Sequence, residues 1–153
     1  MKKFLIGVTM VVFSIAFFNI TVSADGSIVG TWKTVADEGP DKGKAKSHVE
    51  IFEKDGLYFG KVVQLLLKPQ DTLCDKCKGE LYNKPVVGMI FLQNMKKTGI
   101  VDNDFGEEYA GGTIMDPDNG KFYTCRMWVK GDVLTSRGYI AFFYRTQTWS
   151  RVK

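Results

Sequence analysis

Short runs of alternating apolar and polar residues recur along the chain from residue 28 to its end. The runs are rich in Val, Ile, Phe, Tyr and Thr, and no apolar face at helical spacing exceeds about two turns. The pattern predicts eight strands, at residues 28–35, 47–53, 57–67, 87–94, 108–115, 121–129, 133–138 and 145–152. Closure of eight such strands removes exposed sheet edges. We therefore expect an all-β domain folded as a single antiparallel up-and-down barrel.

The segments between the predicted strands are of two kinds. Residues 54–56, 116–120 and 130–132 place Gly, Asn or Asp where a tight hairpin needs a positive φ. Residues 36–46 and 68–85 are longer connections. Long loops on a small β domain either carry function or are mobile.

The first residues have the three parts of a secretory signal peptide. Lys2 and Lys3 form a basic start, residues 4–18 are apolar, and small residues lead up to Ala24. The apolar stretch is shorter than the roughly 20 residues that span a bilayer, which speaks against an uncleaved anchor. The sequence predicts a signal peptide over residues 1–24, cleaved after Ala24, and a periplasmic or secreted protein with no membrane span.

Removal of the signal peptide would leave residues 25–153, enough for one barrel domain but not two. That segment carries 19 basic and 17 acidic residues, so nucleic acid is not expected as a partner. Three cysteines would enter an oxidising compartment, where a disulfide is the expected state. Cys74 and Cys77 are the closest pair in sequence, so we expect the bond between them and one thiol left over.

Three stretches resemble a known family. They are Gly30-Thr31-Trp32, the hairpin Gly111-Gly112-Thr113-Ile114-Met115-Asp116-Pro117 with Gly120-Lys121-Phe122-Tyr123-Thr124-Cys125, and Arg137-Gly138-Tyr139 followed by Arg145-Thr146-Gln147-Thr148-Trp149-Ser150-Arg151-Val152. Together they resemble the bacterial family catalogued as domain of unknown function 2147. The resemblance implies export and a lipocalin-like barrel, and it brings no established reaction. It departs at Tyr144, where the family more often has Gly.

The Gly-x-Trp of residues 30–32 is also similar to the first-strand signature of lipocalins. In that fold the Trp closes one end of the barrel beneath an Arg from the last strand. The resemblance therefore implies that Arg151 or Arg145 stacks on Trp32 through a cation–π contact. The alternative is an ordinary buried Trp.

The cysteines allow two further interpretations. The Cys74–Cys77 spacing is that of a redox motif, but such motifs react at the start of a helix and this pair lies between predicted strands. Together with Cys125 and His48 the pair has a ligand set that zinc accepts, although nothing in the sequence brings the four together. We expect a structural disulfide and no metal, with Cys125 buried inside the barrel.

Catalysis has little support in the sequence. The chain has a single His and lacks a Gly-x-Ser-x-Gly stretch, so the common hydrolase arrangements are missing. Four carboxylates near a predicted turn could share acid and base roles, but a solvated loop is the simpler interpretation: Asp102, Asp104, Glu107 and Glu108. The sequence favours binding over catalysis, with no catalytic residue and no cofactor expected.

Polar residues inside the predicted strands suggest a ligand site. Those that point inward would form a cavity with apolar walls and a few fixed donors, and the alternative for about half of them is a solvated outer face of the barrel. We expect Arg126 or Arg137 to be the polar anchor of this pocket. The expected lining residues are Trp128, Tyr109, Tyr123, Phe59 and Met115.

The sequence thus predicts an exported protein that binds a small apolar or amphipathic molecule, and an acidic head group would suit the arginines. One alternative is an envelope module that contacts another protein and whose barrel is filled by its own side chains. Residues 25–153 contain 16 aromatics, enough to fill a small barrel. A second alternative is an enzyme of unfamiliar type.

Overall fold

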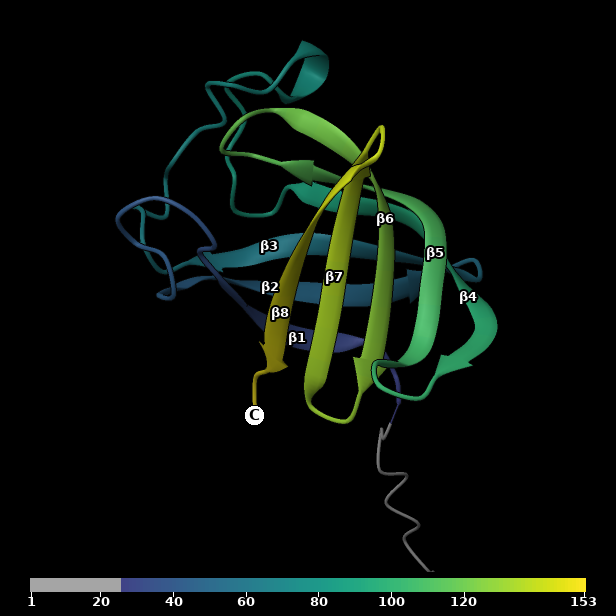
Figure 1. Ribbon diagram of the computed structural model, residues 1–153. Coiled ribbons are helices and arrows are strands. Elements are labelled where there is room, and N and C mark those ends of the chain that lie inside the picture. The colour runs from purple at the N-terminus through teal and green to yellow at the C-terminus, as the bar shows by residue number, and fades with distance from the viewer. Residues whose placement is uncertain (1–25) are drawn as a thin grey trace, which may run out of the picture.

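The computed structural model describes residues 26–153, which form a closed antiparallel barrel of eight strands (Figure 1). Each strand pairs with its sequence neighbours, and the last pairs with the first. The predicted all-β barrel is confirmed, whereas the signal peptide expected over residues 1–24 lies outside the described residues. The strands are β1 (Gly30–Val35), β2 (Ala45–Lys54), β3 (Leu57–Leu65), β4 (Ile90–Asp102), β5 (Gly106–Asp116), β6 (Lys121–Lys130), β7 (Val133–Ile140) and β8 (Phe143–Arg151).

Helical structure is nearly absent from this part of the chain. A single 3₁₀ turn, η1 (Gly79–Leu81), lies in the long connection between β3 and β4. Among residues 26–153 no helix is long and apolar enough to cross a membrane.

Strand bounds agree with the sequence pattern to within a few residues, except in β4. This strand continues to Asp102, well beyond the predicted end at residue 94. Its second half is almost entirely exposed, so it lacks the apolar alternation by which a strand is recognised. Pairing with β5 through Lys96↔Ala110 and Val101↔Glu107 extends it.

Close approach of β4 and β5 depends on one glycine. A Cβ on Gly112 would overlap the carbonyl oxygen of Gln93, so no larger residue fits without moving the backbone. The register of β5 and β6 also shifts between Ala110 and Gly112. Such a bulge bends the strand, and β5 is strongly curved in Figure 1. The bend helps the sheet to close.

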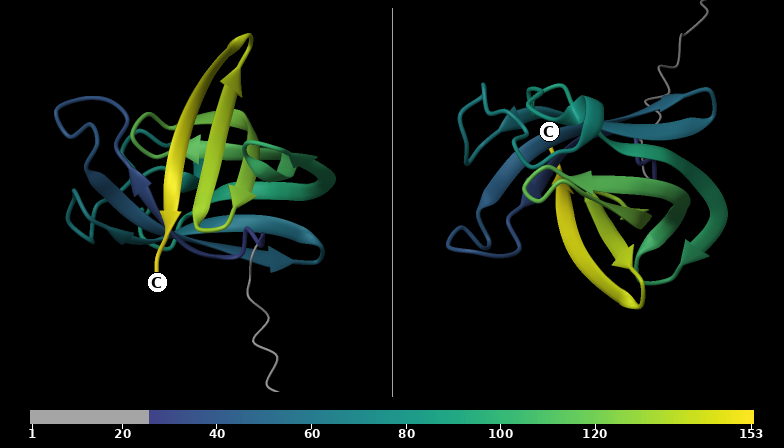
Figure 2. Two further views of the ribbon diagram at one scale, coloured as in Figure 1. Left: turned by 60° about the horizontal axis from the view of Figure 1, so that its bottom comes forward. Right: turned by 90° about the horizontal axis from the view of Figure 1, so that it is seen from above.

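Because the strands run alternately up and down, successive connections lie at opposite ends of the barrel. The β1–β2, β3–β4, β5–β6 and β7–β8 connections share one end, which we call the open end. The other three connections and both ends of the described chain lie at the closed end (Figures 1 and 2). The two long loops are therefore neighbours at the open end.

Trp32 occupies the closed end. It is completely buried and donates from Nε1 to the carbonyl of Ile28 at 2.8 Å. The guanidinium carbon of Arg151 lies 4.2 Å from the centre of the indole ring. Arg151 also donates to the carbonyls of Val29 at 3.0 Å and Ser27 at 2.7 Å. Arg151, and not Arg145, therefore covers Trp32 and ties residues 27–29 across the barrel.

The Cys74–Cys77 disulfide lies in the β3–β4 loop, which confirms the predicted pair. The Sγ atom of Cys77 is 3.9 Å from the Sδ atom of Met115, so the loop packs on the end of β5. Backbone packing is close as well, because a Cβ on Gly120 would overlap the carbonyl of Lys76. The disulfide takes up two of the four residues of the alternative zinc set, which excludes that site.

Candidate ligand cavity

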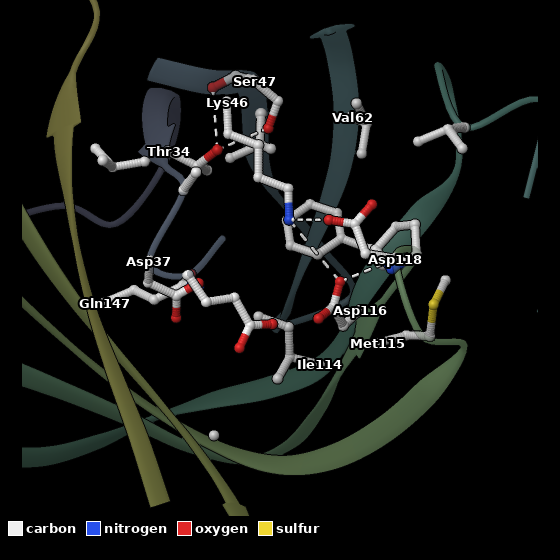
Figure 3. Close-up of a pocket in the computed structure, with 18 of the residues that line it drawn as sticks. Thr34, Asp37, Lys46, Ser47, Val62, Ile114, Met115, Asp116, Asp118 and Gln147 are labelled. Carbon is white, nitrogen blue, oxygen red and sulfur yellow. Dashed lines mark hydrogen bonds and ion pairs between the residues drawn. The ribbon is translucent and has the colours of Figure 1, made fainter. Parts of the chain in front are cut away.

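A cavity of about 780 Å³ lies inside the open end of the barrel. All eight strands contribute to its lining. β4 contributes only Phe91 and β6 only Tyr123, and each of the other strands contributes at least two residues. The β1–β2 and β3–β4 loops and the β5–β6 turn border its mouth. Figure 3 shows part of this lining.

Its inner wall is apolar. Val49 and Val62 belong to β2 and β3, and Ile114 belongs to β5. Phe91 and Trp149 pack against each other with ring centres 6.2 Å apart. Val49, Val62 and Trp149 are directed inward because β-strands alternate their faces, and the residues on either side of each are polar or exposed.

A few polar groups interrupt this wall. The buried hydroxyls of Thr34 and Ser47 are 2.7 Å apart and bond to each other (Figure 3). The indole nitrogen of Trp149 donates to Oε1 of Gln147 at 3.2 Å. Within residues 26–153 the amide nitrogen of Gln147 makes no hydrogen bond. This amide is therefore free to donate to a bound molecule.

Lys46 forms an ion-pair cluster at the mouth. Its Nζ lies 2.7 Å from Asp118 and 3.9 Å from Asp116 (Figure 3). Lys68 also contacts Asp118 at 2.7 Å. Burial alone would lower the pKa of Lys46, but its hydrogen bond with Asp118 and the nearby carboxylates raise it. Burial likewise works against the charge of Asp118, yet the two lysines lower its pKa. Lys46 and Asp118 are therefore both charged at neutral pH.

Arg145 bridges a gap between strands. β1 and β8 pair only at Trp32↔Arg151 and Lys33↔Ser150, so they separate toward the open end. There Arg145 of β8 contacts Asp37 at 3.3 Å and Glu38 at 2.7 Å in the β1–β2 loop. The pairs hold this loop against β8 where no backbone ladder does so.

Two of the residues predicted to line the pocket do so, namely Tyr123 and Met115. Tyr109 also points into the barrel but lies toward the closed end, where its ring packs on Tyr58 at 4.9 Å. Its hydroxyl donates to Glu107 at 3.2 Å, and burial raises the pKa of Tyr109. Tyr109 is therefore core beneath the cavity and not part of its lining.

The other predicted lining residues lie on the outer face of the sheet. Phe59 stacks on its cross-strand neighbour Phe52, with ring centres 5.9 Å apart. Arg126 is exposed and lies 3.6 Å from Glu108. Arg137 stacks on Trp128 at 5.3 Å. Arg126 or Arg137 was expected to provide the polar anchor inside the cavity, and this expectation is wrong because both lie on the outer face of the barrel.

Strand alternation explains this correction. Cys125, Met127 and Val129 are buried and face inward, so Arg126 and Trp128 between them face outward. β7 pairs Arg137 with Arg126, which fixes Arg137 on the same outer face. Tyr123 and Trp128 are five positions apart, so a regular strand cannot direct both of them into the barrel.

Sequence reasoning missed the groups at the mouth. Lys46 lies one residue before the predicted strand, and Asp37 and Asp118 lie in predicted loops, where no periodicity indicates direction. The inward direction of Gln147 could be predicted, because it lies two positions from the buried Trp149 and therefore on the same face of β8. For Arg145 the sequence indicates only a possible stacking on Trp32, through the lipocalin resemblance.

The acidic cluster weighed for catalysis does not converge on one site. Asp102 accepts from the backbone N–H groups of Phe105 and Asp104, bonds that lower its pKa. Glu107 faces inward beside Tyr109, whereas Glu108 faces outward beside Arg126. Across residues 26–153 no group of three or more His, Cys, Asp or Glu is arranged to hold a metal ion.

Comparisons with known proteins agree with this architecture. A solved structure described as protein HP1028 from Helicobacter pylori, which belongs to the lipocalin family, matches with a TM-score of 0.68 and 22% identity. The match covers 83% of this chain and 84% of that one, and it shows a lipocalin-like fold. Comparison with curated proteins finds no match. The model of the family described as "Uncharacterized protein conserved in bacteria (DUF2147)" matches residues 30–151, and the chain therefore belongs to this family.

Proposed function

We propose that this protein binds a small amphipathic molecule inside its barrel. The cavity of about 780 Å³ carries the proposal, since its volume falls within the roughly 300–1,000 Å³ of typical small-molecule sites. An apolar wall with a few fixed polar groups is the usual anatomy of such a site. The lipocalin-like fold supports ligand binding at the level of the fold.

The arrangement of polar groups suggests how the ligand lies. Its apolar part packs against Phe91 and Trp149, and its polar end lies at the mouth near Lys46 and Gln147. Both Lys46 and Arg145 already pair with carboxylates. An acidic head group would have to displace these partners, so an uncharged or zwitterionic polar end fits better than the acid suggested by sequence.

The volume also bears on the alternative of a filled barrel. Several large aromatics that could have filled the interior lie on the outer face, among them Trp128 and Phe59. Gly138 and Ser136 occupy inward positions of β7 and leave space beside Trp149. These placements support an interior that receives a ligand.

We also propose that the protein acts in the periplasm or outside the cell after cleavage behind Ala24. The basic start, apolar stretch and small-residue exit support this, and a Cys74–Cys77 disulfide suits an oxidising compartment. N-terminal sequencing of the exported protein should begin at Asp25. Exported material that still begins at Met1 would contradict the cleavage.

Native mass spectrometry of the protein purified from its own host tests ligand binding. We expect a mass excess that disappears on denaturation, because the ligand is held without a covalent bond. As a second readout, an apolar fluorescent probe such as N-phenyl-1-naphthylamine should gain fluorescence when it enters the cavity. Absence of both signals at high micromolar probe concentration would refute the proposal.

A matched pair of variants locates the binding. Gly138 has ordinary backbone geometry, and a Cβ there would lie 3.4 Å from Tyr123 and 3.7 Å from Ile114, in normal contact. Gly138→Phe should therefore place a ring in the cavity and weaken probe binding at least about tenfold. Thr124→Phe adds the same ring to the outer face of neighbouring β6 and should leave binding unchanged.

A further inference from the structure

Three adjacent aromatic residues are exposed at the tip of the β7–β8 hairpin. Phe142, Phe143 and Tyr144 expose 90%, 70% and 62% of their surface. The hairpin projects beyond the rest of the barrel (Figure 2, left). The rings of Phe142 and Phe143 lie 5.8 Å apart, so they form one apolar surface. A contiguous exposed apolar surface of this kind marks a contact site.

Other exposed apolar residues gather at the same end of the barrel. Of the 15 large apolar residues that are exposed within residues 26–153, nine lie in or beside the open-end connections. They comprise the three tip aromatics together with Leu66, Leu67, Leu73, Tyr82, Phe122 and Ile140. Exposed apolar side chains are therefore concentrated at the open end.

The tip leads directly into the cavity. Ile140, Phe143 and Tyr144 line the mouth, whereas Phe142 lies outside the lining. A path thus runs along the hairpin from the projecting tip, past Gly138 and the ion-paired Arg145, to the wall formed by Phe91 and Trp149. A protein docked on this tip would cover the mouth, but a lipid surface would place amphipathic molecules at the start of the path.

Backbone hydrogen bonding and charge also suit a lipid surface. Ile140 pairs with Phe143, which satisfies backbone groups that would otherwise be unpaired in an apolar phase. The segments 36–44, 66–89 and 117–120 contain seven acidic residues and six lysines. This end is nearly neutral, so attachment depends on the aromatic rings more than on attraction to anionic lipid.

We propose that the β7–β8 tip inserts shallowly into a lipid surface and that the amphipathic ligand passes from that surface into the barrel. The passage of the ligand rests on the proposed binding function. Attachment of the tip does not.

Vesicle flotation tests the attachment. The chain beginning at Asp25 is used, because β1 to β8 all lie within residues 30–151 and the apolar residues 4–18 would bind lipid themselves. Vesicles of phosphatidylcholine, with or without phosphatidylglycerol, should carry the protein upward. Phe142→Ser should weaken partitioning roughly tenfold, the effect of one large apolar side chain. Raising the salt from 0.1 to 0.5 M should change partitioning far less than this substitution does.

The control substitution lies at the opposite end. Val101 is 68% exposed at the end of β4, so Val101→Ser removes exposed apolar surface without touching the tip. It should leave flotation unchanged. If Val101→Ser weakens flotation as much as Phe142→Ser does, insertion through the tip is wrong.

A second pair of measurements separates this proposal from the ligand-binding one. Phe142→Ser should bind N-phenyl-1-naphthylamine in solution as the wild type does, yet receive it more slowly from loaded vesicles. Gly138→Phe should float normally but fail to take up the probe. Flotation without probe uptake by the wild type would refute the binding function and leave attachment standing. Failure of the wild type to float, with concentration-dependent self-association that Phe142→Ser abolishes, would show a protein contact and overturn the proposal.

Discussion

Trp32 joins the first strand to the last through the contact of its ring with Arg151 of β8. One side is covered by Arg151, and the indole nitrogen bonds to Ile28. Arg151 also lies 3.4 Å from Asp132 in the β6–β7 turn, so the same guanidinium reaches a third element of the closed end. Since β1 and β8 share only two paired positions, these side-chain contacts strengthen the shortest seam of the barrel.

Replacement of Trp32 should consequently be costly. Trp32→Ala is expected to lower the free energy of unfolding by about 3–5 kcal/mol, the range for a large buried aromatic. Denaturant unfolding followed by circular dichroism measures it. Phe142→Ala is the control, and its exposed ring should change stability by less than about 0.5 kcal/mol. A loss below about 1 kcal/mol for Trp32→Ala would show that the residue does not hold the seam.

Cys125 is the buried free thiol among the described residues. Its Sγ lies 3.9 Å from the hydroxyl of Ser136, and burial raises the pKa of the thiol to about 12. Thiolate is the reactive form, so iodoacetamide at pH 8 should not modify the folded protein. After denaturation without reductant one thiol per chain should react. Rapid modification of the folded protein, or three reactive thiols on denaturation, would contradict this arrangement.

Sequence alternation specifies which residues share a face, but the direction of that face depends on the whole barrel. Arg126 and Trp128 were correctly placed together, and their outward direction followed from the apolar character of Cys125 and Met127. Residues in loops carry no such signal. Asp37 and Lys46 come together with their partners only after the strands close, so the charged mouth could not be predicted from spacing.

At the scale of elements, the short turns were predictable from local sequence, whereas the conformations of the long loops were not. Asp55 and Gly56 both have positive φ, as the β2–β3 hairpin requires, and short turns of this kind are specified by local sequence. The β1–β2 and β3–β4 loops are held by long-range contacts instead. Lys68 reaches Asp118, which is 50 positions away in the sequence.

The ion pairs between these loops should make the open end sensitive to acid. The pKa of Asp118 is lowered because Lys46 and Lys68 outweigh the effect of burial. Its carboxylate therefore contributes stability above the unfolded-state pKa of about 3.9, and the contribution is lost as pH falls through the lower folded-state value. Thermal unfolding from pH 7 down to pH 2 should show a smaller loss in Asp118→Asn than in wild type below about pH 4.

Asp55→Asn provides the matched control for this pH dependence. Asp55 has a φ of 54° in the β2–β3 turn, a conformation that Asn accepts, and it forms no ion pair within residues 26–153. Its pH profile should follow that of the wild type. Equal acid sensitivity of all three proteins would show that the Asp118 pairs do not hold the open end.

At the scale of the whole molecule, strand number and order were accessible from sequence, whereas the interior volume was not. Sixteen aromatics in residues 25–153 were compatible with a filled barrel or an open one. The outcome depends on how many of them face inward and on small inward residues such as Gly138 and Ser136. The interior volume depends on the closed structure. If a few side chains on several strands are assigned to the wrong face of the sheet, the predicted volume is wrong.

An occupied cavity should stabilise the entire barrel. A ligand that binds the folded state alone adds about 2.7 kcal/mol at 100 times its dissociation constant, which corresponds to roughly 10 °C in Tm for a domain of this size. The cavity lies between strands from both halves of the chain, so the stabilisation should appear as a single shifted transition. Differential scanning calorimetry with N-phenyl-1-naphthylamine should show this shift in wild type and in Thr124→Phe. Gly138→Phe should show at most about half of this shift, since its ring takes up part of the space, and an equal shift in that variant would place the probe outside the barrel.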